Sequence, residues 1–421
     1  GAGVIGCSIA YELSKSKDKE IAVIERNKKI PGENQSSRNS GVIHAGIYYP
    51  KNKGPLKASL CLEGNKLLYE FCEEHKIPHK KTGKLVVATN KLEEDYLNNV
   101  FKIAEENKVP EIRIISKEKI KEYEPNVEAI KALYVPTTGI IDSTELVNKL
   151  YSLSKLNNVT FATYNEVINI TKKNSKFIVT TKSNNDFDEL ETKFLINSAG
   201  LYSDEIAKMI NPESPYKIDP IRGETAKFYK KRKDISMNGL NIYPVPYGFL
   251  PNGDRLQVPF NEFQKLFSEG KITKSVGVHL TPTLEFFNNE YFIGKTVTIG
   301  PAYKTPINKE DYSQTRKEDY YLEMVKPFFP NLKLEDITLD FSGIRAKLKN
   351  HYDFVIEKDS KHKNCINLVG IDSPGLTCSL AIAKYVKELI NNWFIYLFRL
   401  EYSGNCFFNR VNRLKRKRKA K

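Results

Sequence analysis

Two histidines stand in segments whose composition suits chemistry. His44 lies in "NSGVIHAGIYYP" (39–50) and His279 in "GVHLTP" (277–282), and both segments are apolar and contain glycine. An imidazole titrates close to neutral pH, so each ring is a candidate general base or hydrogen-bond donor. An isolated histidine in such a loop is more often a structural group bonded to a carbonyl. The surrounding segments therefore decide whether each histidine is structural or catalytic. The other four histidines lie among lysines and glutamates and are interpreted as surface residues.

Basic and aromatic residues elsewhere offer ligands for an acidic substrate. Arg345 in "FSGIRAKL" is the best candidate for a carboxylate clamp, because a planar guanidinium pairs with a carboxylate through two parallel hydrogen bonds. Lys347 and Arg222 are the next candidates, and an ion pair with the nearby Glu224 is the alternative for Arg222. Tyr243 in "NIYPVP" either lines the substrate pocket or packs in the core.

The first residues match a nucleotide-binding pattern. "GAGVIG" places Gly1, Gly3 and Gly6 in the GxGxxG spacing, a helical segment follows ("CSIAYELSKS"), and a short buried strand ("IAVIERN") carries Glu25. In such a unit the first glycine makes a tight turn, the second lets the backbone approach a pyrophosphate, and the third lets helix and strand pack closely. The helix N-terminus holds the phosphate charge and the acid binds ribose hydroxyls. This order predicts dinucleotide binding.

Two later segments repeat the order of strand and helix and favour FAD over NAD. Residues 192–210 contain a buried strand that runs into Ala199 and Gly200, and residues 364–390 contain another before Ser373 and Gly375 open a helix. Such a helix start leaves N–H groups free for an anion or for the polar edge of a flavin. Each segment alone is better explained by an ordinary strand–helix pair. A site built from three distant segments indicates FAD, because NAD dehydrogenases keep their site in one contiguous half.

The composition is that of an ordinary globular protein with a basic end. The chain has 421 residues, 40% of them hydrophobic and 28% charged. Its net charge is +15, and eight of its basic residues lie in the C-terminal segment "NRVNRLKRKRKAK". The body has no nucleic-acid-binding motif, so nucleic acid is not expected as a partner. The tail is interpreted as a solvated end, with a peripheral contact to anionic lipid as the alternative.

The cysteines and the apolar runs set further bounds. The six cysteines form no CxxC pair and no metal-ligand spacing, which indicates reduced thiols and no metal site. The apolar run "WFIYLF" (393–398) is far shorter than the ~20 residues that a membrane span requires. No signal peptide is visible.

The order of these segments predicts an α/β fold with two interleaved domains. A Rossmann-like FAD-binding domain is expected at 1–82, 142–215 and 336–392, and a mainly antiparallel α+β substrate-binding domain at 83–141 and 216–335. Four segments of the second domain favour strands: 84–89, 111–115, 131–135 and 216–300. The strand that normally precedes a GxGxxG motif is expected to be absent from this chain.

Further segments follow the order found in one known family: "GKLVVA", "TGIID", "INSAGLYSD", "RGE", "NIYPVP", "GVHLTP", "GPA", "SGIRAKL" and "SPGLTCSLAIA". The chain resembles the L-2-hydroxyglutarate dehydrogenases and oxidases of the FAD-dependent D-amino-acid-oxidase-like superfamily, from residue 1 to about 392. The resemblance implies FAD, oxidation of L-2-hydroxyglutarate to 2-oxoglutarate, and a quinone-type acceptor or oxygen for the electrons. It implies a mitochondrial location in a eukaryote, and otherwise a cytoplasmic or membrane-peripheral one.

With such a substrate, the candidates take specific roles. His279 is predicted to be the base and His44 the flavin-side partner, for which related superfamily members raise the option of a covalent bond to FAD. Arg345 clamps one carboxylate, and Lys347 or Arg222 binds the second. The residues assigned to FAD are Gly1, Gly3, Gly6, Glu25, Arg26, Ser40, Gly41, His44, Val167, Ala199, Gly200, Ser373, Gly375 and Leu376.

Two segments depart from the family. Residues 247–276 intervene where the family passes within a few residues from "YPVP" to "GVHLTP", and this insertion is expected beside the substrate pocket. The basic tail, 393–421, matches nothing in the family. Two alternatives stay open: a flavin oxidase of an amino acid, an amine or another 2-hydroxy acid, and a truncated, inactive flavoprotein remnant.

Overall fold

Short parallel ladders form from the predicted buried strands. β1 (Ala22–Glu25) pairs with β8 (Thr160–Thr163), and β12 (Leu195–Asn197) pairs with β22 (Cys365–Val369), whose other edge carries the antiparallel β21 (Val355–Lys358). The computed structural model describes residues 1–250, 255–288 and 290–391. Within those residues no hydrogen-bonded ladder joins the two groups of strands.

The first two residues connect the ends of these ladders. The Ala2 N–H donates to Glu25 Oε2 at the end of β1 (2.6 Å), and the Ser198 hydroxyl, just after β12, donates to the Gly1 carbonyl (3.3 Å). The turn before the first helix therefore lies where both groups of parallel strands end.

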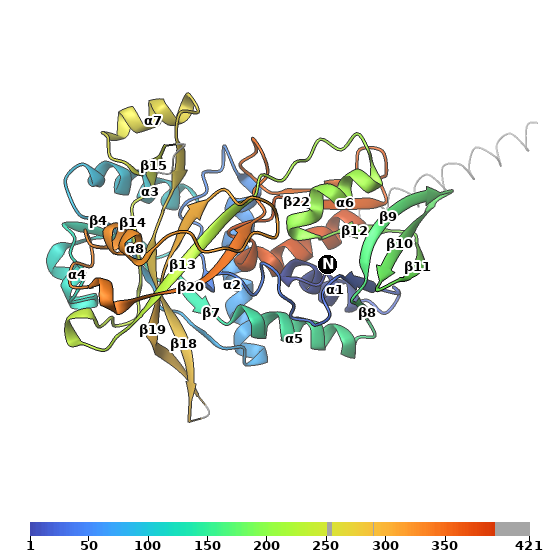
Figure 1. The fold of residues 1–421 in the computed structure, drawn as a ribbon, viewed down its shortest axis with the longest axis horizontal. Helices are drawn as coiled ribbons and strands as arrows, with labels where there is room; N and C mark the ends of the chain where they lie inside the picture. The colour runs from blue at the N-terminus through green and yellow to red at the C-terminus, as the bar shows by residue number, and fades with distance from the viewer. Residues whose placement is uncertain (251–254, 289, 392–421) are drawn as a thin grey trace, which may run out of the picture.

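Long helices pack around the parallel strands (Figure 1). They are α1 (Val4–Ser14), α2 (Pro55–His75), α5 (Ser143–Leu156), α6 (Ser203–Ile210) and a helix at 375–391. α5 begins where Asp142 accepts hydrogen bonds from two N–H groups of the first turn, a typical N-cap. A Cβ at Gly64 would lie 2.4 Å from the Thr377 carbonyl oxygen, so this glycine lets α2 pack directly on the helix at 375–391.

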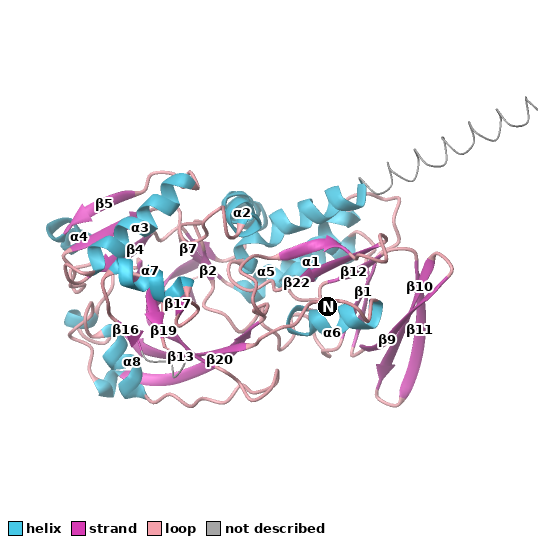
Figure 2. Ribbon diagram, turned by 90° about the horizontal axis from the view of Figure 1, so that it is seen from above, coloured by secondary structure: helices cyan, strands magenta, loops and turns pink. Residues whose placement is uncertain are grey.

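An eight-stranded sheet fills the other half of the molecule (Figures 1 and 2). All neighbouring strands in it are antiparallel except β14 and β4. In sheet order the strands are β20 (Ile337–Arg345), β13 (Ile221–Tyr229), β19 (Glu290–Lys304), β18 (His279–Phe287), β14 (Asn241–Pro244), β4 (Lys84–Ala88), β6 (Lys131–Val135) and β5 (Arg113–Ser116). The predicted strands at 84–89, 111–115 and 131–135 are confirmed.

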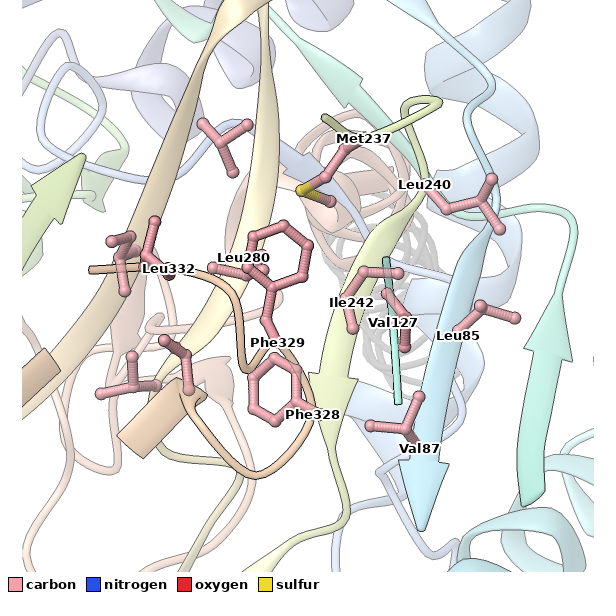
Figure 3. Close-up of a cluster of buried hydrophobic side chains, with 14 of the residues drawn as sticks. Leu85, Val87, Val127, Met237, Leu240, Ile242, Leu280, Phe328, Phe329 and Leu332 are labelled. Carbon is pink, nitrogen blue, oxygen red and sulfur yellow. The ribbon is translucent and has the colours of Figure 1, made fainter. Parts of the chain in front are cut away.

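The central strands of this sheet are buried on both faces. On one face Leu85, Ile242 and Leu280, from three neighbouring strands, pack with Phe328 and Phe329 (Figure 3). Because successive side chains of a strand alternate between faces, the residues next to them in sequence point to the opposite face. That opposite face borders the candidate site.

Smaller sheets and short helices complete the fold. Two three-stranded sheets are β2 (Val42–Ile43), β7 (Gly139–Ile141) and β3 (His79–Lys80), and β9 (Glu166–Lys173), β10 (Lys176–Ser183) and β11 (Asp186–Thr192). The insertion 247–276 forms a third from β15 (Tyr247–Phe249), β16 (Arg255–Leu256) and β17 (Thr273–Ser275), together with α7 (Phe260–Ser268). The remaining helices are α3 (Glu93–Glu106), α4 (Lys117–Tyr123), α8 (Glu318–Val325), η1 (Gly200–Tyr202), η2 (Lys233–Ile235) and η3 (Leu334–Asp336).

The α/β fold class predicted from the sequence is confirmed. The boundaries of the two domains stay a prediction, and the basic tail lies outside the described residues. Among the helices that the structure describes, none is long and apolar enough to cross a bilayer.

Candidate active site

A large cavity lies where the parallel ladders meet the eight-stranded sheet. Its volume is about 1450 Å³, whereas small-molecule pockets typically measure roughly 300–1,000 Å³. Residues from the start of α1, from the loop before β2 and from β20 line it, together with the loop at 370–376. The size suits a dinucleotide together with a small substrate.

The glycine fingerprint forms an anion-binding helix start. α1 follows Gly3, which provides no side-chain capping bond, and its first turn contains no acidic residue. The first N–H groups of a helix lack intrahelical partners and carry partial positive charge, so this end suits a phosphate; one of them, from Val4, donates to Ser36 Oγ (2.8 Å). Gly1 and Gly3 line the cavity.

Gly6 and Gly41, which are also predicted to hold the cofactor, do not line the cavity. A Cβ at Gly6 would lie 1.9 Å from the Gly1 carbonyl oxygen, so this glycine permits the close helix packing that the motif predicts. Gly41 has a φ of +62°, and a Cβ there would lie 2.5 Å from the Ile141 carbonyl oxygen. Both glycines shape the backbone around the cavity, and a direct contact with the cofactor stays a prediction.

Glu25 and Arg26 lie at the end of β1 and line the cavity. The Glu25 carboxylate accepts the N–H groups of Ala2 (2.6 Å) and Asn27 (2.9 Å), which fix its orientation. The Arg26 guanidinium pairs with Glu310 and lies 4.1 Å from the centroid of the Tyr202 ring. This corner therefore presents a fixed carboxylate and an arginine to whatever occupies it. The other cofactor candidates that line the cavity are Ser40, His44, Val167, Ala199, Gly200, Ser373, Gly375 and Leu376.

His44 is held firmly by its backbone. Its N–H donates to Thr377 Oγ1 (2.9 Å), and its carbonyl accepts from Asn65 Nδ2 (2.9 Å). The ring nitrogen Nε2 lies 3.2 Å from Ser373 Oγ. Burial, followed by the positive charges of Lys84 and Arg345, lowers the pKa of His44 well below its ordinary value. The imidazole is therefore uncharged at neutral pH.

His279 lines the same cavity from the first position of β18. Its ring stacks on Tyr243 with centroids 3.7 Å apart and planes 13° from parallel, and Nδ1 lies 3.2 Å from Thr281 Oγ1. Burial, followed by the positive charge of Lys84, lowers the pKa of His279 well below its ordinary value. The structure thus brings two uncharged imidazoles to one cavity.

Arg345 lies at the end of β20 and is held by an acid that the sequence did not single out. Its Nη2 pairs with Asp372 (2.6 Å), whose other oxygen accepts from Lys57 Nζ (2.7 Å). Burial opposes ionisation of Asp372, but the charges of Lys57 and Arg345 outweigh it and lower the pKa of the carboxyl group. The buried Nε of Arg345 has no hydrogen-bond partner among the described residues. The side chain is 34% exposed, so another part of the guanidinium is accessible to a ligand.

Arg222, a predicted substrate ligand, does not line the cavity. Its guanidinium is buried and binds Glu224 (2.7 Å) and Asp311 (2.5 Å). It also donates to the hydroxyl groups of Ser313 and Thr315. All three guanidinium nitrogens therefore have partners, as in the ion pair that the sequence offered as the alternative.

The insertion borders the cavity. Phe249, Phe267, Ile272 and Lys274 all contribute to its lining, and burial lowers the pKa of Lys274 to about 8. Three earlier candidates, Lys347, Tyr243 and Arg345, line it as well, and His351, interpreted as a surface residue, is exposed on its lining. The segment that departs from the family is therefore in a position to affect what the cavity accepts.

The sequence did not predict Asp372, Lys57 and Lys84 as residues of the site. Asp372 immediately precedes the Ser373 segment, so a polar residue before a helix start was the available signal. Lys84 is a lysine in an otherwise apolar strand, "KLVVA", and is 1% exposed. Nothing in the sequence around Lys57, which lies on α2, indicates its contact with Asp372.

Taken together, the cavity combines an anion-binding helix start, a carboxylate at the end of the second strand, two uncharged imidazoles and a guanidinium. These features define a dinucleotide-dependent oxidoreductase. The family model described as FAD dependent oxidoreductase matches residues 1–389, so the chain belongs to this family. Its cofactor is FAD, which the uncapped start of α1, the fixed Glu25 carboxylate and the cavity volume fit.

Named relatives are similar over nearly the whole chain. A mitochondrial L-2-hydroxyglutarate dehydrogenase from Caenorhabditis briggsae is 32% identical, covering 92% of this chain and 91% of that protein. A glycerol 3-phosphate dehydrogenase from Caloramator mitchellensis is 34% identical, covering 93% and 73%. The structure of dithionite-reduced L-alpha-glycerophosphate oxidase from Mycoplasma pneumoniae with FAD bound has a TM-score of 0.77 and 25% identity, covering 93% of each chain.

Proposed function

We propose that this protein oxidises L-2-hydroxyglutarate to 2-oxoglutarate. The observation that carries the proposal is that His44, His279 and Arg345 line one cavity beside the glycine-rich helix start. A 2-hydroxy acid requires such a set: a base for the hydroxyl proton and a fixed cation for the carboxylate. The L-2-hydroxyglutarate dehydrogenases from Caenorhabditis briggsae and from the bacterium Indibacter alkaliphilus, 32% and 30% identical, support this substrate.

His279 is the proposed base. An unprotonated imidazole accepts the hydroxyl proton of the substrate, and the lowered pKa of His279 keeps the ring in this form at neutral pH. In the tautomer that donates from Nδ1 to Thr281 Oγ1, the nitrogen Nε2 is the acceptor. Stacking on Tyr243 holds the plane of the ring.

His44 is the proposed flavin-side residue. Its ring lies within hydrogen-bond distance of Ser373, in the loop that opens the helix at 375–391. The backbone bonds to Thr377 and Asn65 fix its position relative to that loop. A covalent bond between His44 and FAD stays a prediction, which the mass of the denatured protein tests.

Arg345 and Lys347 are the proposed carboxylate ligands. The accessible part of the Arg345 guanidinium donates to the carboxylate beside the reacting carbon, while Asp372 holds Nη2. Because Arg222 is bound to Glu224 and Asp311, Lys347 is the remaining predicted ligand for the second carboxylate. Lys274 of the insertion is a further cation on the same cavity.

FAD, when bound, accepts a hydride at N5 of the flavin. With FAD bound at the start of α1, His279 would take the hydroxyl proton while the hydride and its two electrons left C2, so that a ketone would form. A quinone-type acceptor or oxygen, a mitochondrial or membrane-peripheral location and a lipid contact of the tail stay predictions.

Glycerol 3-phosphate is the second candidate substrate. The relative from Caloramator mitchellensis and the Mycoplasma pneumoniae structure are both named for this chemistry. A secondary alcohol on C2 requires the same base, and a phosphate binds to the same kind of cation as a carboxylate. The two candidates therefore differ in the anion that Arg345 receives.

A substrate panel tests the proposal. The purified protein is assayed by dye reduction with L-2-hydroxyglutarate, D-2-hydroxyglutarate, L-lactate, glycerol 3-phosphate and glycine. The proposal predicts the highest kcat/KM for L-2-hydroxyglutarate. A higher value for glycerol 3-phosphate selects the second candidate, a higher value for glycine selects an amine oxidase, and a protein that purifies without flavin supports the inactive remnant.

A further inference from the structure

Lys84 is a buried lysine without an acidic partner. It lies at the start of β4 and is 1% exposed. Across the residues that the structure describes, its ammonium group forms neither an ion pair nor a hydrogen bond, and its neighbours are the faces of two aromatic rings. The ammonium nitrogen lies 3.6 Å from the centroid of the Tyr243 ring and 5.5 Å from that of Tyr48. An unpaired buried charge is costly, so its retention needs an explanation.

The sheet places Lys84 in a row with the proposed base. β4 pairs with β14 so that Val86 lies opposite Tyr243, and β14 pairs with β18 so that Ile242 lies opposite Leu280. Because side chains alternate along a strand, Lys84, Tyr243 and His279 all point to the face that borders the cavity. The Tyr243 ring contacts the Lys84 ammonium at 3.6 Å and the His279 ring at 3.7 Å.

We propose that Lys84 is a positioning residue of this site: its ammonium, held against Tyr243, keeps the imidazole of His279 uncharged and therefore able to accept a proton. The proposal rests on the proposed function, in which His279 is the base. The physical reason is repulsion across one aromatic ring. The face of a tyrosine ring attracts one cation, but protonation of His279 would place a second cation against the same ring.

The other titratable or charged groups around this row are His44, Tyr48, Cys61 and Arg345. His279 faces His44 from the segment after β2, and His44 is itself close to Arg345. Lys84 faces Tyr48, which follows the same segment, and the Cys61 thiol on α2. None of these groups is a carboxylate, so none of them is an anionic partner for the ammonium. The lowered pKa of His279, with Lys84 as its largest charge contribution after burial, is consistent with this arrangement.

The arrangement serves the reaction at two points. Before the reaction, at pH values near or below the Lys84 pKa of about 7, the ammonium holds His279 in the form that accepts the hydroxyl proton. After the reaction the new imidazolium is repelled by Lys84, which favours release of the proton and return to the starting state. The negative charge of a bound acid offsets Lys84 only while that acid is present.

The test measures the protonation of His279 directly. The imidazole pKa values of the FAD-containing protein are followed by NMR with isotope-labelled histidine, and the His279 signal is assigned by its loss in His279→Gln. In Lys84→Met the pKa of His279 is expected to rise by about one pH unit, and the acidic limb of the kcat/KM profile is expected to move by the same amount. Lys84→Arg keeps a cation on the ring and is expected to restore values close to wild type.

Lys131→Met is the matched control, because Lys131 lies on the neighbouring β6 in an ion pair with Glu94 and is expected to leave the pKa of His279 unchanged. An unchanged pKa in folded, FAD-containing Lys84→Met would overturn the proposal, as would an equal rise in Lys84→Arg. If Lys84→Met does not retain FAD, the wild-type protein decides: a His279 pKa at or above the ordinary 6.5 contradicts the proposal. The titration needs no substrate, so a failed substrate panel would leave its result intact.

Discussion

Two cations are buried in the same eight-stranded sheet, and their surroundings are opposite. Arg222 on β13 and Lys84 on β4 are each 1% exposed. Arg222 binds two carboxylates and two hydroxyl groups. The ammonium of Lys84 lies against the rings of Tyr243 and Tyr48 and has no ion pair or hydrogen bond among the described residues. Arg222 lies away from the cavity, whereas Lys84 contacts a ring that lines it.

This difference indicates that the charge of Arg222 is structural and that the charge of Lys84 is functional. A buried ion pair with complete hydrogen bonding is compatible with stability, and removing one partner leaves the other charge unpaired. A buried cation without an anion lowers stability, and such groups concentrate at functional sites. We therefore expect substitution of Arg222 to lower stability and leave the activity of the folded protein unchanged, and substitution of Lys84 to raise stability and alter activity.

The largest effect is expected at His279, the group that Lys84 influences. His279→Ala should lower kcat by roughly 10²–10⁴-fold, because loss of a general base acts on the transition state. FAD should remain bound, since the proposed flavin-side histidine is His44. Steady-state kinetics with the flavin content as a control measures this. A variant that turns over normally, together with an inactive but flavin-containing His44→Ala, would show that the two roles are reversed.

Arg222→Met is expected to destabilise the protein by about 3–5 kcal/mol, because Glu224 and Asp311 lose their buried partner. Denaturant unfolding monitored by circular dichroism measures the loss. The fraction that folds should keep the wild-type kcat per bound flavin. Lys176→Met, which removes an exposed ion pair with Glu191, is the control and should change stability little. A stable Arg222→Met with a raised KM would return this arginine to the substrate site.

Arg345→Lys is expected to raise KM for a dicarboxylate by roughly ten- to a hundredfold, because it keeps the charge but loses the planar fork. Asp372→Asn should change KM in the same direction by less, since it loosens Arg345 without removing it. Both are measured with L-2-hydroxyglutarate at constant flavin content. An unchanged KM in Arg345→Lys would remove the clamp assignment.

Lys84→Met should be more stable than wild type at pH 7, the opposite of Arg222→Met. Burial lowers the pKa of Lys84 from 10.5 to about 7. Between these values the unfolded chain binds the proton that the folded protein has released, so wild-type stability should rise with pH by up to about 1.4 kcal/mol per unit. The slope should weaken in Lys84→Met. Denaturant midpoints from pH 7 to 10 measure it, and parallel curves for both proteins would contradict an unpaired lysine.

The sequence predicts the two ends of this site for different reasons. Gly1, Gly3 and Glu25 follow a local motif whose spacing is set by one turn and one helix, so the order of residues suffices. His44 and His279 are identified by unusual surroundings, apolar and glycine-rich, even though they are far apart in the chain. Strands such as β4 and β6 follow from their apolar runs.

Contacts between distant side chains escape such reasoning. Arg222 and Arg345 look alike in sequence, and only the positions of Asp311 and Asp372 show that one is fully engaged and the other half free. Lys84 resembles an exposed residue at the start of a strand. Its burial depends on strand pairing with β14, which no local pattern encodes.

The main proposal is that this protein transfers a hydride from C2 of a 2-hydroxy acid to its flavin. It is tested by mixing the FAD-containing protein, without oxygen, with L-2-hydroxyglutarate that carries hydrogen or deuterium at C2, while the visible absorption of the flavin is followed. We expect the flavin to bleach, deuterium to slow the bleaching, and one 2-oxoglutarate to form per flavin. A flavin that stays oxidised with L-2-hydroxyglutarate but bleaches with glycerol 3-phosphate would contradict it.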